Sequence, residues 1–428
     1  SESEIQALAG ADPIAPLLAV KSDERSPEQV ALLRSFYLTN HDKPWQKVSK
    51  QLRDLKSKIT ESEKPISTVM VMQDVPKMRS TFILDRGQYA SPRKDSPVNP
   101  GVLSALPPLP PEAPTNRLGL SQWLVQKDHP LTARVTVNRY WYMLFGTGLV
   151  KTLEDFGSQG EWPSHPALLD WLAVELHDSG WDLKHMLRLM VNSRTFRQGS
   201  ALRDGVNDPE NKLWARGPHY RLDAEVLRDI ALWASGLLDP HMGGEGVKPY
   251  QPAGLWKALA HPGSNTKNYV RDNGQRLYRR SLYVYWKRTS PHPMMTLFDA
   301  PSRETSCVNR SRTNTPLQSL GLFNETQRIE MARMFAERLL KERTTDTERL
   351  DLCFTLLACR EPSDAERTAC VNLLQTMRTR YADADKEALA LLGTGEVPRD
   401  KSLNTTDHAA WTQLSVTLLA SDLALMMF

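Results

Sequence analysis

The residues with the clearest capacity for chemistry lie in one segment, Arg279–Gln318, which mixes charged, thiol and amide side chains. Between Arg279 and Arg312 the segment holds six Arg and one Lys against two acidic residues, so its net charge is +5, whereas the whole chain carries +4. A β-rich run, Ser281–Trp286, is expected to lead into an irregular loop. Charge gathered in an irregular segment is typical of a site rather than of a scaffold.

Arginine binds carboxylate, sulfate or phosphate through paired hydrogen bonds, so this segment predicts an anion site. Its candidate binding residues are Arg280, Arg288, Arg303, Arg310, Arg312, Asn314 and Gln318. The carboxylates Asp299 and Glu304 could act as acid and base, or they could pair with the arginines and brace the loop. Cys307 could be a nucleophile whose thiolate the arginines stabilise, or a structural thiol.

A second polar segment runs from Asn138 to His165. Asn138, Arg139 and Trp141 fall near the end of an apolar helix, and a glycine-rich loop follows before the next helix begins. An anion or a sugar hydroxyl could bind the free N–H groups of such a loop. His165 could be a base or a ligand, or it could serve only to begin the helix. We expect both segments to meet around one cleft.

Sequence motifs of known chemistry are absent. The chain has no Cys-x-x-Cys-His, no Gly-x-Ser-x-Gly, no His-Glu-x-x-His, no Rossmann fingerprint and no EF-hand loop. Without a Cys-x-x-Cys pair we expect no metal site. Three of the four cysteines, Cys353, Cys359 and Cys370, are close in sequence, which allows one local disulfide or three free thiols. The mild positive charge does not indicate nucleic-acid binding, and no apolar run is long enough for a membrane span.

Apolar periodicity predicts a mainly α protein with a few short strands and long irregular loops. A helical segment at 1–66 is followed by an extended, proline-rich arm at 67–114 and a helical body at 115–428. Local signals place several helix starts, among them Ser26-Pro27, Asp182 and the Ser363/Glu366 capping box. Extended runs are expected at 68–72 and 80–84, a long helical region at 315–341 and one apolar helix at 407–427.

Several long blocks of the chain resemble the planctomycete-specific PSD domain, a family of unknown function. The blocks are NRLGLSQWLV at Asn116, HPLTARVTVNRYW at His129, EDFGSQGEWPSHPALLDWLAVEL at Glu154, SGWDLKHMLRLMVNSRTFRQ at Ser179, RLDAEVLRD at Arg221, RRSLYVYWKRT at Arg279 and LFDAPSRETSCVNRSRTNTPLQSL at Leu297. The resemblance covers about 67–428, and the preceding piece is similar to the linker that follows a companion domain.

The resemblance implies an exported protein, in the periplasm or at the cell surface, that works with haem. Members of the family carry a signal peptide, a cytochrome c domain and a second family-specific domain before this one. This chain lacks the haem motif, so haem c is expected on a partner chain or on a separate domain.

Three functions are compatible with these observations. The first is a component of a cytochrome c-associated redox complex that shapes a polar substrate pocket, for example for a carbohydrate, while haem accepts the electrons. The second is a non-catalytic module that docks a cytochrome. The third is a hydrolase or lyase in which His165, Asp299 or Glu304 acts as acid or base.

Overall fold

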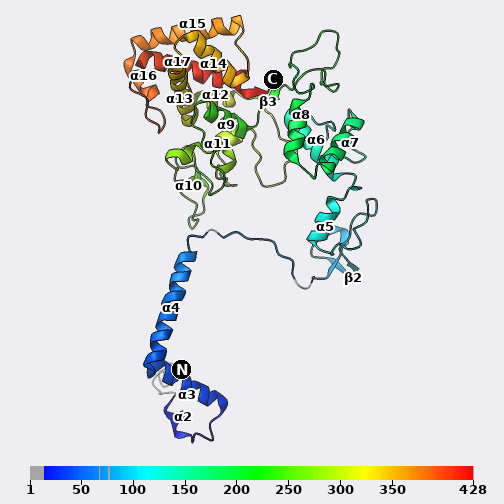
Figure 1. Ribbon diagram of the computed structural model, residues 1–428, viewed down its shortest axis with the longest axis vertical. Coiled ribbons are helices and arrows are strands. Elements are labelled where there is room, and N and C mark those ends of the chain that lie inside the picture. Colours follow the sequence, from blue (N-terminus) through cyan, green and yellow to red (C-terminus); the bar gives the residue numbers. More distant parts are fainter. Residues whose placement is uncertain (1–13, 67, 76–77, 428) are drawn as a thin grey trace. The chain divides into compact units, whose positions relative to one another are not determined.

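The computed structural model describes residues 14–66, 68–75 and 78–427, and it divides into two compact units, Ser1–Asn99 and Pro100–Phe428 (Figure 1). The described part is mainly α-helical, as the sequence predicts. The division falls inside the segment expected to form an extended arm.

The first unit combines three helices with a hairpin: α2 (Ala15–Ala19), α3 (Pro27–Asn40), α4 (Lys43–Glu63), β1 (Thr81–Leu84) and β2 (Pro92–Val98). Helix α3 begins as predicted, because Ser26 and Gln29 cap its first turn reciprocally through hydrogen bonds of 3.3 and 3.0 Å. The hairpin is antiparallel, with Thr81 opposite Val98 and Leu84 opposite Pro92.

The extended run expected at 68–72 does not form a paired strand. The stretch has suitable β-branched and large apolar residues, but no partner strand pairs with it among the described residues. Val69, Met70 and Val71 remain largely exposed, so β propensity alone does not make a strand here.

The second unit contains the remaining elements. They are α5 (Arg117–Leu124), α6 (Thr132–Phe145), α7 (Pro166–Asp178), α8 (Leu183–Asn192), β3 (Tyr220–Arg221), α9 (Ala224–Ala234), α10 (Leu255–Leu259), α11 (Pro293–Leu297), α12 (Pro316–Asn324), α13 (Thr326–Glu342), α14 (Asp346–Ala358), α15 (Asp364–Ala382), α16 (Asp385–Leu392), α17 (Thr405–Leu419), α18 (Asp422–Leu425) and β4 (Met426–Met427).

Two hydrophobic cores organise this unit. Helix α17 packs against α13, α15 and α16 (Figure 1), and the largest core centres on residues such as Phe335 and Trp411, which are fully buried. A second core lies among α6, α7 and α8 and includes Trp141 and Phe145. Burial of these large side chains is the main favourable contribution to the stability of the helical body.

Two element predictions need correction, and a third is refined. The helical region expected at 315–341 consists of two helices, because Glu325 leaves helical geometry and its carboxylate then caps α13 by accepting a 2.7 Å bond from the Arg328 N–H. The helix expected at 407–427 ends at Leu419 and is followed by α18 and the two-residue strand β4. The run at 281–286 forms a 3₁₀ turn and a single bridge between Val247 and Val284, because no full strand lies beside it.

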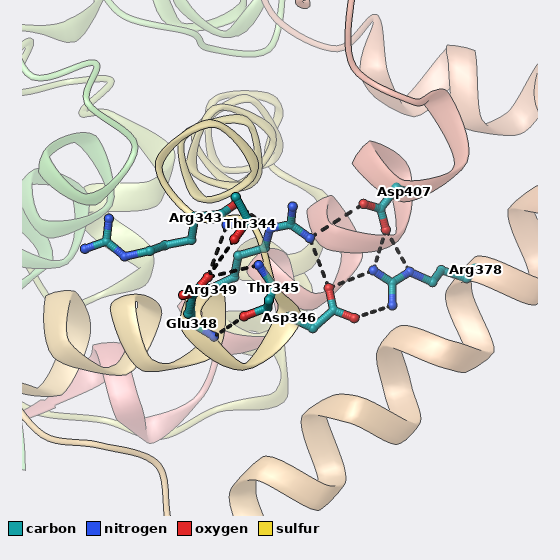
Figure 2. Close-up of polar contacts among 8 residues, drawn as sticks. All are labelled: Arg343, Thr344, Thr345, Asp346, Glu348, Arg349, Arg378 and Asp407. Atoms are coloured by element: carbon teal, nitrogen blue, oxygen red, sulfur yellow. Dashed lines mark hydrogen bonds and ion pairs between the residues drawn. The ribbon is translucent and has the colours of Figure 1, made fainter.

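Ion pairs connect the C-terminal helices α14, α15 and α17. Arg378 binds Asp346 through bonds of 2.5 and 2.8 Å and Asp407 through bonds of 2.6 and 2.7 Å (Figure 2). Arg349 adds a 3.1 Å bond to Asp346, and Thr345 begins α14 with a capping box. Two arginines and two aspartates from three helices thus form one network.

In the described part of the chain, no helix is long and apolar enough to cross a membrane.

Candidate functional site

Asp299, a predicted acid or base, is fully engaged by its own chain. Its carboxylate accepts bonds from Arg221 Nη2 at 2.5 Å, from the Thr313 N–H at 2.8 Å and from Thr313 Oγ1 at 2.9 Å. The side chain is only 15% exposed. Gln318 is buried nearby and donates to Thr313 Oγ1 and to the Leu297 carbonyl. This arrangement ties the two ends of the 299–313 loop together and leaves the carboxylate little capacity for a ligand.

Arg310 also pairs with carboxylates of the chain. Its guanidinium lies 2.7 and 3.3 Å from the two oxygens of Glu225 and 3.4 Å from Asp223. Glu225 lies in the first turn of α9, so this ion pair fixes the loop to the start of that helix. The pKa of Arg310 is raised above its ordinary value because the bonds with Glu225 outweigh the effect of burial.

The remaining predicted residues of the segment lie at its surface. Arg288 pairs with Glu304 at 3.3 Å, and both side chains are more than half exposed. Arg303 lies over the Trp286 ring at 4.6 Å. Arg280 is exposed with its guanidinium 3.6 Å from Met242 Sδ. Asn314 is also exposed.

The base of the segment is held by two buried arginines. Arg228 donates to the carbonyls of Leu277 and Arg279, and burial lowers the pKa of its guanidinium to about 10. Arg279 in turn donates to the carbonyls of His241, Gly243 and Glu245 at 2.5 to 3.0 Å. These bonds satisfy backbone carbonyls of a glycine-rich loop. Much of the positive charge counted in the sequence therefore braces the fold.

The two predicted segments do meet, through the candidate Arg312 and through Tyr142 and Asn309, which were not predicted. Tyr142 donates to Asn309 Oδ1 at 3.1 Å, and Arg312 donates to the Gly146 carbonyl at 3.3 Å. The Arg312 guanidinium also lies over the rings of Tyr142 and Tyr220 at 5.2 and 4.3 Å. The end of α6 is thereby joined to the 299–313 loop.

In the second segment, Asn138 and Trp141 belong to the interior. Asn138 is fully buried and exchanges two bonds of 2.9 Å with the N–H and carbonyl of Val150. A Cβ at Gly148 would lie 2.8 Å from Asn138 Nδ2 and 2.4 Å from the Val150 carbonyl oxygen, so the close approach needs glycine. Trp141 stacks on Phe145 at 4.1 Å and packs in the core. Asn138 therefore fixes the conformation of the 146–150 loop from its buried side.

Two further predicted residues lie at the ends of this segment. Arg139 is exposed on α6. His165 precedes α7 and does not cap it with its side chain; its Nδ1 lies 3.2 Å from Ser164 Oγ.

The 146–150 loop forms one wall of a groove of about 310 Å³, which we call the loop groove. Its lining residues are Thr147, Gly148, Leu149, Lys151, Glu161, Trp162, Ser164, Glu210, Asn211, Lys212 and Trp214. Three loops contribute to it, and each is held by bonds of its own.

The glycine-rich loop of the groove is fixed by Thr152 and Asp155. Thr152 Oγ1 donates to the Asp155 carbonyl at 2.8 Å and accepts from the Glu161 N–H at 3.0 Å. A Cβ at Gly160 would lie 2.3 Å from the Asp155 carbonyl oxygen. On the opposite side, Asp208 accepts from the N–H groups of residues 212 and 213 at 2.8 and 2.7 Å. Both walls are therefore held by hydrogen bonds before any ligand enters.

The charge in the groove comes from two lysines and two glutamates, Lys151, Lys212, Glu161 and Glu210, and three of them form ion pairs. Glu210 Oε2 lies 3.2 Å from Lys151 Nζ and 3.3 Å from Lys212 Nζ. The hydrogen bond from Lys151 lowers the pKa of Glu210, and the same bond raises the pKa of Lys151. Glu210 therefore stays ionised at neutral pH and is suited to accept hydrogen bonds, not to deliver a proton.

Trp162 is the most unusual side chain of the groove, because it is 92% exposed. The other tryptophan of the lining, Trp214, is 8% exposed and packs against Trp141. A fully solvated indole beside charged and amide groups can stack on an apolar face of a ligand while the polar groups bind its hydroxyls.

Trp162, Lys151 and the wall at 210–214 were not among the predicted site residues. Trp162 has a sequence signal, since it precedes a proline in a glycine-rich loop, and loops lie at the surface and often carry function. The 210–214 wall has no comparable signal.

A metal site needs several ligand side chains close together, and a covalently attached haem needs its own cysteine motif. Among the described residues, no three His, Cys, Asp or Glu side chains gather as a metal site, and the chain has no haem-attachment motif. The four cysteines are free: Cys307 and Cys359 are exposed, while Cys353 and Cys370 are buried. Burial raises the pKa of the Cys353 thiol, which makes it unreactive.

Comparison with known proteins gives a family and no function. No curated protein and no solved structure matches the chain. The model of the family PSD1, described as a protein of unknown function (DUF1553), matches residues 116–374, which is more than half of the chain and includes all of the loop groove. The chain therefore belongs to the PSD1 family.

Proposed function

We propose that this chain is the haem-free, ligand-binding component of an exported redox complex. The loop groove would hold a polar substrate of the carbohydrate class, and haem on a partner chain or domain would accept the electrons. The observation that carries the binding part is the 92% exposed Trp162 at the groove.

The chemistry of the groove suits a sugar. Sugar rings present C–H faces that stack on an indole, and their hydroxyls bind charged and amide side chains. The groove offers the Trp162 ring together with Lys151, Glu210 and Lys212. Because these charged groups already neutralise one another in part, the groove favours a hydroxylated ligand over a strongly anionic one.

The redox and export parts of the proposal rest on the family resemblance. A haem group would supply a one-electron acceptor, whereas this chain would bind and orient the substrate. An acid–base reaction has less support, since Asp299 is saturated by hydrogen bonds and Glu210 is held ionised.

Binding can be tested directly with the purified chain. Titration with a panel of oligosaccharides, followed by tryptophan fluorescence and calorimetry, should identify a ligand. Trp162→Ala should weaken its binding by about fivefold, since one aromatic stack contributes about 1 kcal/mol. Trp233→Ala is the matched control, because Trp233 is 48% exposed on α9 and does not line the groove. Equal affinity of the Trp162 variant and the wild type for the ligand would show that the loop groove is not the binding site.

The electron-transfer part needs a second experiment with a haem partner. A ligand found in the panel should reduce the haem of a co-purified cytochrome, and Trp162→Ala should slow this reduction. Binding without any haem reduction would retain the binding role and reject the redox role.

A second candidate function is a non-catalytic module that docks a cytochrome. It is favoured by the internal ion pairs of Asp299 and Arg310, which indicate bracing. If alanine at either position lowers the stability of the fold while cytochrome capture by the folded protein persists, docking is supported. A stable variant that no longer supports haem reduction would favour a substrate site at this loop instead.

A further inference from the structure

Five apolar side chains form an exposed row along α4, which we call the α4 stripe: Trp45, Val48, Leu52, Leu55 and Ile59. Their exposed fractions are 41, 62, 52, 57 and 57%, respectively. No described residue of α4 is buried. A contiguous exposed apolar row of this length on a soluble protein marks an interaction surface.

The spacing of the α4 stripe is that of a coiled-coil seam. Successive members are three, four, three and four residues apart, which places Trp45, Leu52 and Ile59 at heptad position a and Val48 and Leu55 at position d. A helix that packs on its own domain usually presents a wider apolar face. The α4 stripe is narrow, so its natural cover is one other helix.

We infer that the α4 stripe is the seam of a parallel two-stranded coiled coil formed with α4 of a second copy of this chain. This self-association goes beyond the ligand binding proposed above and does not depend on it.

The charges beside the seam support a second copy in parallel orientation. Lys58 occupies position g, and Glu63 occupies the e position five residues later. In a parallel pair, Lys58 of each copy faces Glu63 of the other, which gives two symmetric ion pairs. Gln51 and Lys56 face each other in the preceding heptad, so no like charges meet. An antiparallel pair would place Lys58 near Gln51 and would lose both ion pairs.

Only Ile59 at a and Leu55 at d match the pattern that favours two strands, a β-branched residue at a with leucine at d. Leu52 at a and Val48 at d do not match it, so the assignment of two parallel strands rests on the charges beside the seam. The other charged residues, such as Lys50 and Arg53, lie outside the seam and remain solvated. Since α4 spans only about three heptads, we expect a dissociation constant on the order of 10 µM instead of a permanent dimer.

Self-association of the full chain can be measured by sedimentation velocity over a concentration series. The wild type should shift from monomer to dimer, and Leu52→Asp should raise the dissociation constant at least tenfold. Ser57→Asp is the matched control, because it adds the same charge to α4 on the side away from the seam and should leave the constant unchanged. A wild type that stays monomeric up to its solubility limit overturns the inference, as does a dimer that Leu52→Asp leaves intact.

Charge reversal tests the orientation. Lys58→Glu should weaken the dimer about tenfold, because each ion pair becomes a repulsion. Adding Glu63→Lys to the same chain should restore the wild-type constant. A dimer that responds to Leu52→Asp and ignores Lys58→Glu overturns the parallel arrangement.

Discussion

Replacement of Arg378 by glutamine should weaken the interaction of α15 with α14 and α17 and lower the free energy of unfolding. The change removes the guanidinium that binds Asp346 and Asp407 and leaves both carboxylates to Arg349, whose bonds are longer at 3.1 and 3.9 Å (Figure 2). Helix α15 then keeps only its other polar contacts, among them the Arg367–Asp351 ion pair with α14 at 2.7 Å and the 2.9 Å bond from Gln413 of α17 to Tyr381 Oη. The packing of these helices remains, so the variant should fold.

The expected loss in the free energy of unfolding lies between the values typical of exposed and of buried ion pairs. Exposed ion pairs contribute about 0.2–1 kcal/mol, whereas breaking a buried pair costs about 3–5 kcal/mol. The side chains of Arg378, Asp346 and Asp407 are 29, 34 and 27% exposed, so the network is intermediate. We expect a loss of about 2 kcal/mol in the free energy of unfolding, or on the order of 4 °C in melting temperature.

The pH dependence follows from the pKa of Asp346. The hydrogen bonds from Arg378 hold the pKa of this carboxyl below its ordinary value in the folded protein. The stabilisation is therefore complete above the unfolded pKa of about 4 and is lost as the pH falls through the lower folded pKa. The difference between the wild type and Arg378→Gln should be full at pH 7 and should shrink below about pH 4.

Urea unfolding at neutral and acidic pH, followed by circular dichroism, provides the assay. Arg380→Gln is the control, because Arg380 lies two residues further along α15 and its ion pair with Glu387 is more than half exposed. That variant should unfold at nearly the same urea concentration as the wild type, because an exposed ion pair contributes little to stability. Equal losses in the two variants, or a difference that does not change with pH, would refute the assigned role of the network.

Three further changes test other parts of the fold. Asn138→Ala leaves a buried backbone N–H and carbonyl unpaired and should cost about 2–4 kcal/mol in urea unfolding. Gly395→Ala should lower the free energy of unfolding by about 2–3 kcal/mol, because φ is +97° and a Cβ would lie 2.3 Å from Glu330 Cδ. Gly101→Ala is the control, because its Cβ would point into open space, and it should leave the melting temperature unchanged. Burial lowers the pKa of His292 from 6.5 to about 4 in the folded protein. As the pH falls from 6.5 to 4, the unfolded chain therefore binds a proton that the folded protein does not, and the free energy of unfolding should fall by about 3 kcal/mol. His292→Gln should remove this dependence of stability on pH.

Local features of the fold could be predicted because their causes are local. Ser26, Asp182 and Ser363 begin helices as expected, since each side chain caps N–H groups two or three residues away. The break at Glu325 has a weak local signal, because its neighbours Asn324 and Thr326 are poor helix formers, although the apolar pattern continues beyond them.

The role of the arginine-rich segment could not be read from its own residues. The partners of Asp299 and Arg310 are Arg221 and Glu225, which lie 78 and 85 residues away in the sequence. The net charge of one segment leaves out acidic residues from other parts of the chain, such as Glu225, that the tertiary fold places beside its arginines. The exposure of Trp162 likewise depends on which side of a loop faces solvent, and composition does not decide this.

The pairing of β3 with β4 has a consequence for the time course of folding. Tyr220 and Arg221 form their strand with Met427 and Met426, and the Leu222 N–H donates to the Leu425 carbonyl at 2.8 Å. Since roughly 200 residues separate the partners, a ribosome that adds about 5–20 residues per second needs roughly 10 to 40 s between them. Throughout this interval the backbone of β3, before α9, has no partner strand. A chaperone that binds nascent chains would therefore be expected to bind this segment.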